Sequence, residues 1–120
     1  MIRGDTKRCK WMIKGMETDG NITFWKPTEK DKVYFTCKKD YDSEIAFQKV
    51  FPGNIRFDEE SGYFYTIIEP KDTNKLPFGT YVYDIEIVIN GNSKEKNIVK
   101  TCTVGKLEIE KEVTFRRDEV

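Results

Sequence analysis

The stretch LPFGTYVYDIEIVINGN (residues 76–92) decides the fold. From residue 80 to residue 89 its side chains alternate, which predicts a half-buried β-strand because successive side chains of a strand point to opposite faces. Asn90-Gly91 then predicts a tight turn into the segment NGNSKEK. The residues on the predicted inner face are Tyr81, Tyr83, Ile85, Ile87 and Ile89.

The same two-residue period recurs through the rest of the chain. We expect a first strand near residues 5–15, a short one at residues 22–25, and others at residues 32–38 and 45–51. The expected inner side chains of these segments are Cys9, Trp11, Ile13, Val33, Phe35, Cys37, Ile45, Phe47 and Phe51, with Lys49 as the polar exception. Asp19-Gly20 predicts a turn, and Pro27 ends the short strand or confines it to a sheet edge.

NIRF and GYFYTII (residues 54–57 and 62–68) flank the acidic loop DEESG and predict a hairpin. In the last region, Ile98, Cys102 and Val104 share one phase, whereas Leu107 and Ile109 share the opposite one. A one-residue shift turns every side chain to the other face, so we expect a bulge or a break between two strands at Gly105.

Seven to eight short strands without a helical period predict an all-β protein, an antiparallel β-sandwich in a single domain over residues 1–120. Residues 71–79 have the length of a connection that crosses between the sheets, with room for one helical turn. Tyr81 follows that connection. It is placed to form a tyrosine corner, in which the hydroxyl bonds to the preceding backbone.

Composition excludes several classes of function. Lysine and arginine together number 21, as do aspartate and glutamate, so no net field attracts nucleic acid or an anionic membrane. The chain has no histidine, which removes the commonest general base and metal ligand. We therefore expect no enzyme activity, cofactor, metal, nucleic acid or membrane contact, and neither a signal peptide nor a membrane span.

The three cysteines, Cys9, Cys37 and Cys102, are widely spaced and allow at most one disulfide. We expect reduced, buried thiols. A pairing of Cys37 with Cys102 in the manner of antibody domains is disfavoured, because Trp11 and Trp25 both precede Cys37, whereas the core tryptophan of those domains follows the first cysteine.

Four short patterns have an ordinary structural interpretation that we favour over a chemical one. RGD at residues 3–5 fits a strand entry better than an adhesion motif. Three consecutive acids, Asp58, Glu59 and Glu60, fit a hairpin tip better than a calcium loop, whose ligands alternate. The carboxylate trio of Asp40, Asp42 and Glu44, beside Tyr41, would need a cleft for acid/base work. A single-strand stacking platform would need the aromatics on the lysine face; its residues would be Lys7, Lys10, Lys14, Lys38 and Lys39 with Trp11, Tyr34 and Phe35.

Exposed aromatic residues are the remaining candidates for a protein interface, since aromatics are enriched at such contacts. The candidates are Phe78, in the crossing connection, and the tyrosines Tyr34 and Tyr63.

Three stretches carry a resemblance to a known family. IRGDT (residues 2–6), KVYFTCKKDYDSEIAFQK (residues 32–49) and YTIIEPKDTNKLPFGTYVYDIEI (residues 65–87) resemble the amino-terminal domain of the upper baseplate proteins of tailed phages of Gram-positive hosts. The ending LEIEKEVTF is similar to the point where that domain stops. METDGNITFWKPTEKD (residues 16–31) departs from the family's short glycine-containing link.

The resemblance implies an immunoglobulin-like β-sandwich in a virion tail, made in the host cytoplasm. It implies a non-enzymatic assembly module that docks to other tail or baseplate proteins and forms a homo-oligomer in the particle. The resemblance transfers no catalytic residue. The alternative is a cell-surface β-sandwich that binds a carbohydrate or an adhesion partner.

Overall fold

The computed structural model describes residues 1–16, 22–90 and 98–110 of the chain. Within these ranges the elements are, in order, β1 (Lys7–Trp11), β2 (Lys14–Met16), β3 (Ile22–Phe24), β4 (Lys32–Lys38), β5 (Ile45–Phe51), β6 (Ile55–Phe57), β7 (Phe64–Ile68), α1 (Pro70–Thr73), β8 (Gly79–Ile89) and β9 (Ile98–Ile109).

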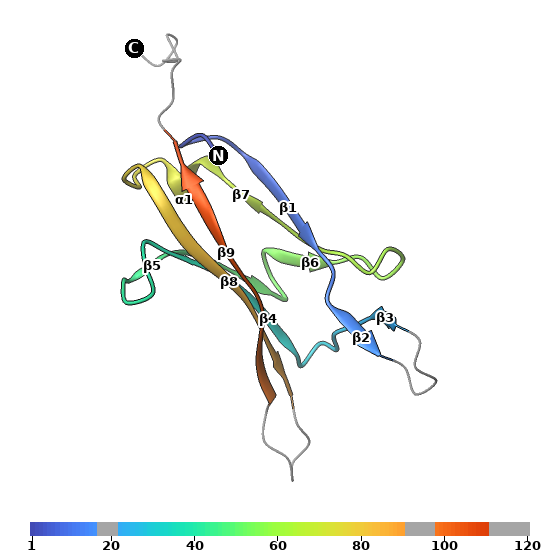
Figure 1. Cartoon of the computed structure of the whole chain (residues 1–120). Helices are drawn as coiled ribbons and strands as arrows, with labels where there is room; N and C mark the ends of the chain where they lie inside the picture. The colour runs from blue at the N-terminus through green and yellow to red at the C-terminus, as the bar shows by residue number, and fades with distance from the viewer. Residues whose placement is uncertain (17–21, 91–97, 111–120) are drawn as a thin grey trace.

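Two antiparallel sheets form the body of the protein (Figure 1). One has the order β1-β7-β6 and the other the order β5-β4-β8-β9, and β2 pairs with β3 in a separate ribbon. The predicted all-β sandwich is therefore confirmed, as is the hairpin of β6 and β7. A three-stranded and a four-stranded antiparallel sheet together make up this β-sandwich.

The core lies between the two sheets, and the predicted alternation places its side chains. In β4, for example, Val33, Phe35 and Cys37 are buried while the side chains between them are partly exposed. The buried apolar residues are Ile13, Val33, Phe35, Cys37, Phe47, Ile55, Phe64, Ile68, Tyr81, Ile85, Ile87, Leu107 and Ile109.

Aromatic rings fill the middle of the core. Phe64 of β7 is fully buried, and its ring centroid lies 4.7 Å from that of Phe57, 5.7 Å from that of Phe51, and 6.0 Å from those of Trp11 and Trp25. These partners come from both sheets and from the residue that follows β3. Phe64 therefore joins the sheets and the β2–β3 ribbon.

The inner face of β5 differs from its prediction at one end. Ile45 is 51 % exposed, because the register shifts between Cys37 and Lys38, so that Phe47 pairs with Cys37 but Ile45 with Lys38. The extra residue, Ala46, turns Ile45 outward. Lys49 stays in phase with Phe47 and is 4 % exposed.

The predicted bulge or break at Gly105 is wrong. β9 is continuous, Gly105 pairs with Tyr83, and the register shift lies upstream, where Thr103 and Thr101 pair with Ile85 and Glu86. The glycine has a packing role instead, because a Cβ at residue 105 would overlap the Tyr83 ring.

The predicted first strand near residues 5–15 divides into β1 and β2. Met12 is 40 % exposed between them, and the carbonyl of Ile13 accepts a hydrogen bond from the Trp25 N–H (2.7 Å) rather than continuing the β1–β7 ladder. The predicted turns at Asp19-Gly20 and over residues 91–97 lie outside the described residues.

The amino terminus is bonded to the end of β9. Ile2 forms a parallel bridge with Glu110, through hydrogen bonds from the Arg3 N–H to the Glu110 carbonyl (2.8 Å) and from the Glu110 N–H to the Met1 carbonyl (2.9 Å). Residues 1–3 thereby link the start of β1 to the opposite sheet.

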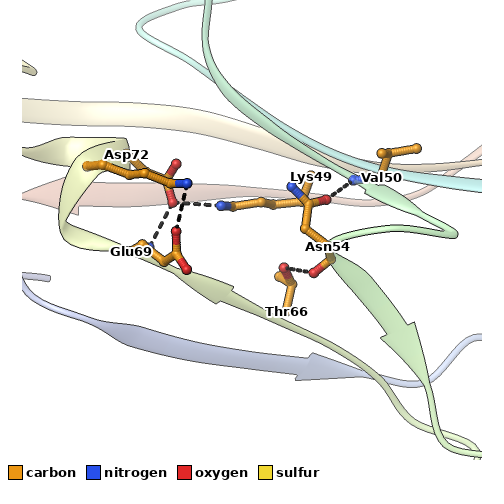
Figure 2. Close-up of polar contacts among 7 residues, drawn as sticks. Lys49, Val50, Asn54, Thr66, Glu69 and Asp72 are labelled. Carbon is orange, nitrogen blue, oxygen red and sulfur yellow. Dashed lines mark hydrogen bonds and ion pairs between the residues drawn. The ribbon is translucent and has the colours of Figure 1, made fainter.

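The connection between β7 and β8 contains one helical turn, α1, as predicted. Asp72 closes its capping box by accepting the Glu69 N–H (2.7 Å), and the same oxygen, Oδ2, lies 2.7 Å from Lys49 Nζ (Figure 2). The two charged side chains are 5 % and 13 % exposed, so this is a buried ion pair. It attaches α1 to β5.

A tyrosine hydroxyl fixes the other end of this connection. Tyr81 is 1 % exposed, and its hydroxyl donates a hydrogen bond to the Pro77 carbonyl oxygen at 2.7 Å, which is the contact of a tyrosine corner. Burial, followed by the neighbouring Cys37, raises the pKa of Tyr81. Tyr81 therefore stays a neutral donor over the ordinary pH range.

Replacing Tyr81 with Phe should lower the free energy of unfolding by about 1–3 kcal/mol, because the Pro77 carbonyl loses its buried donor. Urea unfolding monitored by circular dichroism measures this. Tyr83→Phe is the matched control, since its hydroxyl makes no hydrogen bond among the described residues; its change should stay within about 0.5 kcal/mol. Equal losses in the two variants would contradict the role of the corner.

Replacing Asp72 with Ala should lower the free energy of unfolding by about 3–5 kcal/mol, because it leaves the Lys49 ammonium buried without its partner. Lys49→Met should cost less, since Asp72 keeps the Glu69 N–H. The exposed pair of Lys71 and Glu69 (3.2 Å) is the control, and Lys71→Met should change stability by less than about 1 kcal/mol. Chemical denaturation of the three variants measures whether the loss of stability is largest for Asp72→Ala. A loss for Asp72→Ala no larger than that for Lys71→Met would refute the role of the ion pair.

Candidate protein interface

The three predicted interface residues do not form one surface. Phe78 follows α1 and is 42 % exposed, with the Arg3 guanidinium 4.1 Å from its ring centroid. Tyr34 points outward from β4, where it pairs with Val50 and Glu86. Tyr63 lies just before β7, with Lys10 Nζ 4.8 Å from its ring centroid. The structure thus leaves Phe78, Tyr34 and Tyr63 as separate candidates.

RGD at residues 3–5 lies against other elements of the protein. The Gly4 N–H donates to Thr73 Oγ1 of α1 (2.9 Å), and Gly4 has a φ of 82°, a left-handed conformation that favours glycine. The segment leads from the Glu110 bridge into β1. This placement fits the strand-entry interpretation.

The acidic loop between β6 and β7 is held by hydrogen bonds among its own residues. Asp58 Oδ1 accepts the Glu60 N–H (3.2 Å) and Asp58 Oδ2 accepts the Ser61 hydroxyl (2.8 Å). Its carboxylate is therefore occupied by the turn. Among the described residues, no group of three or more His, Cys, Asp or Glu is arranged to hold a metal ion.

The residues of the disfavoured stacking platform do not lie on one surface of the sandwich. Trp11 and Phe35 pack together in the interior, with ring centroids 6.1 Å apart, whereas Lys7, Lys10 and Lys14 are exposed. The interpretation that places basic residues outside and aromatic ones inside holds for these residues. Tyr34 is the exception, since it faces outward.

Sequence reasoning missed a surface on the outer side of the three-stranded sheet. In its register Lys10 and Arg56 flank Tyr65, and Arg8 lies beside Ile67. Tyr65 and Ile67 are each 42 % exposed, and the three basic side chains are exposed. We call Arg8, Lys10, Arg56, Tyr65 and Ile67 the basic face. The alternation within each strand predicts which side chains face outward. It does not predict that β7 pairs with both β1 and β6, and this long-range pairing is what brings the five residues together.

A second surface lies in the loop between β4 and β5, which protrudes from the sandwich (Figure 1). Tyr41 is 71 % exposed, and the carboxylates of Asp40, Asp42 and Glu44 around it are also exposed. The Asp42 N–H donates to Asp40 Oδ1 (3.0 Å), which shapes the turn. We call Asp40, Tyr41, Asp42 and Glu44 the acidic tip. Its carboxylates stay in water, which does not suit them to acid/base chemistry.

The three cysteines are free thiols, but only Cys37 is buried as expected; Cys9 and Cys102 are partly exposed. Burial raises the pKa of Cys37 to about 12, and burial also raises the pKa of Cys9 and of Cys102. Because the thiolate is the reactive form, Cys37 is an inert core residue rather than a nucleophile.

Comparisons with protein-family models, curated proteins and solved structures gave no match to this chain. No helix in the described part of the chain is both long and apolar enough to cross a membrane. A proposal for the function therefore rests on the sequence and on the geometry of the exposed surfaces.

Proposed function

We propose that this chain is a non-enzymatic assembly module of a phage or prophage tail baseplate, which docks to other tail proteins. The proposal starts from the sequence resemblance over residues 2–6, 32–49 and 65–87. The antiparallel sandwich and its tyrosine corner are compatible with that resemblance.

The observation that carries the assembly role is the pair of exposed surfaces, the basic face and the acidic tip. Each places an exposed tyrosine among charged side chains; tyrosine is enriched at protein contacts, and complementary charges give such contacts specificity. The acidic tip is a protruding loop (Figure 1), whereas small-molecule sites are usually concave. Protein docking is therefore favoured over catalysis or ligand binding.

The test of the baseplate role is made on particles. Phage released from the source strain is purified, and its proteins are quantified by mass spectrometry. We expect several copies of this chain per particle. If the other tail proteins are readily detected and this chain is missing, the baseplate role is refuted, and the cell-surface alternative becomes the leading hypothesis.

Phe78→Lys should reduce incorporation into particles if Phe78 anchors a docking contact. An aromatic anchor contributes about 2 kcal/mol or more, which corresponds to about 30-fold in affinity. The number of copies per particle is the measurement, and circular dichroism verifies the fold. Thr80→Lys, which adds the same charge two residues away, is the control. Undiminished incorporation of Phe78→Lys would remove this residue from the interface.

A further inference from the structure

We propose that the acidic tip of one copy of this chain docks on the basic face of a second copy, so that the chains associate head to tail. This inference rests on the proposed assembly function and names one of the contacts that it requires.

The basic face has an excess of positive charge. Among the described residues, the side chains of Arg8, Lys10 and Arg56 make no ion pair. The two carboxylates at its border, Glu69 and Asp72, are already paired, with Lys71 and Lys49 respectively. Within the described part of the chain these three cations therefore have no carboxylate partner, although the whole chain has a net charge of zero.

The shape of the basic face offers space for a partner. Tyr65 and Ile67 form a ridge on β7, the central strand of the sheet. One hollow lies between this ridge and Arg8 and Lys10 of β1. Another lies on the far side of the ridge and includes Arg56 of β6. A partner that brings carboxylates toward the hollows and an aromatic ring onto the ridge would match both.

The acidic tip has this composition. Its three carboxylates make no ion pair within the described ranges. Tyr41, between Asp40 and Asp42, has the largest exposed fraction of the large apolar side chains that the structure describes, at 71 %. Three carboxylates around one ring thus complement three cations around an apolar ridge, and electrostatic complementarity of this kind favours a specific contact.

The contact has to join two copies. The basic face points away from the four-stranded sheet, whereas the acidic tip connects β4 and β5 of that sheet. The two surfaces thus belong to different sheets, and among the described residues no ion pair joins them within one copy, so the proposed contact is made between copies. Because the tip and the face are different surfaces, the contact is heterologous, and repeated contacts generate a ring or an open chain.

A nucleic acid or another phosphate polymer is the weaker candidate for the basic face. Polyanion binding depends on many cations and a summed positive field, and here three cations lie on a neutral chain. The ridge also presents Ile67, an aliphatic side chain on which a base does not stack.

The test compares self-association of the wild type with two neutralised variants by sedimentation velocity. The face variant carries Arg8→Gln and Arg56→Gln, and the tip variant carries Asp42→Asn and Glu44→Gln. We expect the wild type to form larger species with rising concentration and each variant to associate about tenfold more weakly, a loss of about 1.4 kcal/mol. Equal unfolding midpoints verify that both variants fold.

Mixing the variants gives the sharpest result. The face variant retains an acidic tip and the tip variant retains a basic face, so an equimolar mixture should form one-to-one dimers and no larger species.

A control variant carries Glu59→Gln and Glu60→Gln, which removes two charges from the loop between β6 and β7 and should leave association unchanged. The wild-type association should weaken from about 0.1 M to about 1 M salt, as the screening length falls from about 10 Å to about 3 Å.

Several outcomes would overturn the inference: a wild type that stays monomeric, variants that associate like the wild type, a mixture without dimers, or a control loop variant that dissociates. Binding of a fluorescent single-stranded oligonucleotide that is lost in the face variant, with no self-association, would assign the face to a polyanion instead. A monomeric chain that is nevertheless abundant in particles would refute this contact and leave the proposed function standing.

Discussion

The packing of Phe64 is the constraint on which the rest of the structure depends. Its ring is fully buried and contacts Phe57 within its own sheet, Phe51 in the opposite sheet, and Trp25 after the β2–β3 ribbon. A chain without described disulfides has to hold two sheets together by side-chain burial. With Phe64 in place, β7 is fixed as the central strand of the three-stranded sheet, and its outward residues, Tyr65 and Ile67, are thereby presented to solvent.

The sequence predicted the fold class and most strand positions because alternation is a local property. Val33, Phe35 and Cys37 point inward as their period requires. The errors arise where a side chain or a bulge overrides the period. Ala46 adds a residue that turns Ile45 outward, and the Tyr83 ring occupies the space above Gly105, so the glycine marks a close contact rather than an irregular strand. Neither effect leaves a signal that one strand alone can show.

The candidate surfaces were less accessible to sequence reasoning, because they depend on which strands become neighbours. Arg8 and Lys10 lie more than forty residues from Arg56 and Tyr65, and only the pairing of β1 and β6 with β7 brings them together. The acidic tip is contiguous in the sequence, so its carboxylates could be identified. What the sequence did not show is the basic face, which is the surface of opposite charge on the same chain. Phe78, Tyr34 and Tyr63 were chosen as exposed aromatics, but only Phe78 is exposed, Tyr34 and Tyr63 are partly exposed, and the three do not share one surface.

One edge of the four-stranded sheet, strand β9, bears on how two copies would meet under the proposal above. A bare edge strand invites pairing with another chain, and proteins block such edges with bulges, lysines and covering segments. β9 has all three, because its register shifts near Cys102, Lys100 and Lys106 lie along it, and residues 1–3 cover its end at Glu110. Protection of this edge disfavours pairing of β9 with another copy, whereas the basic face and the acidic tip provide side-chain surfaces of opposite charge.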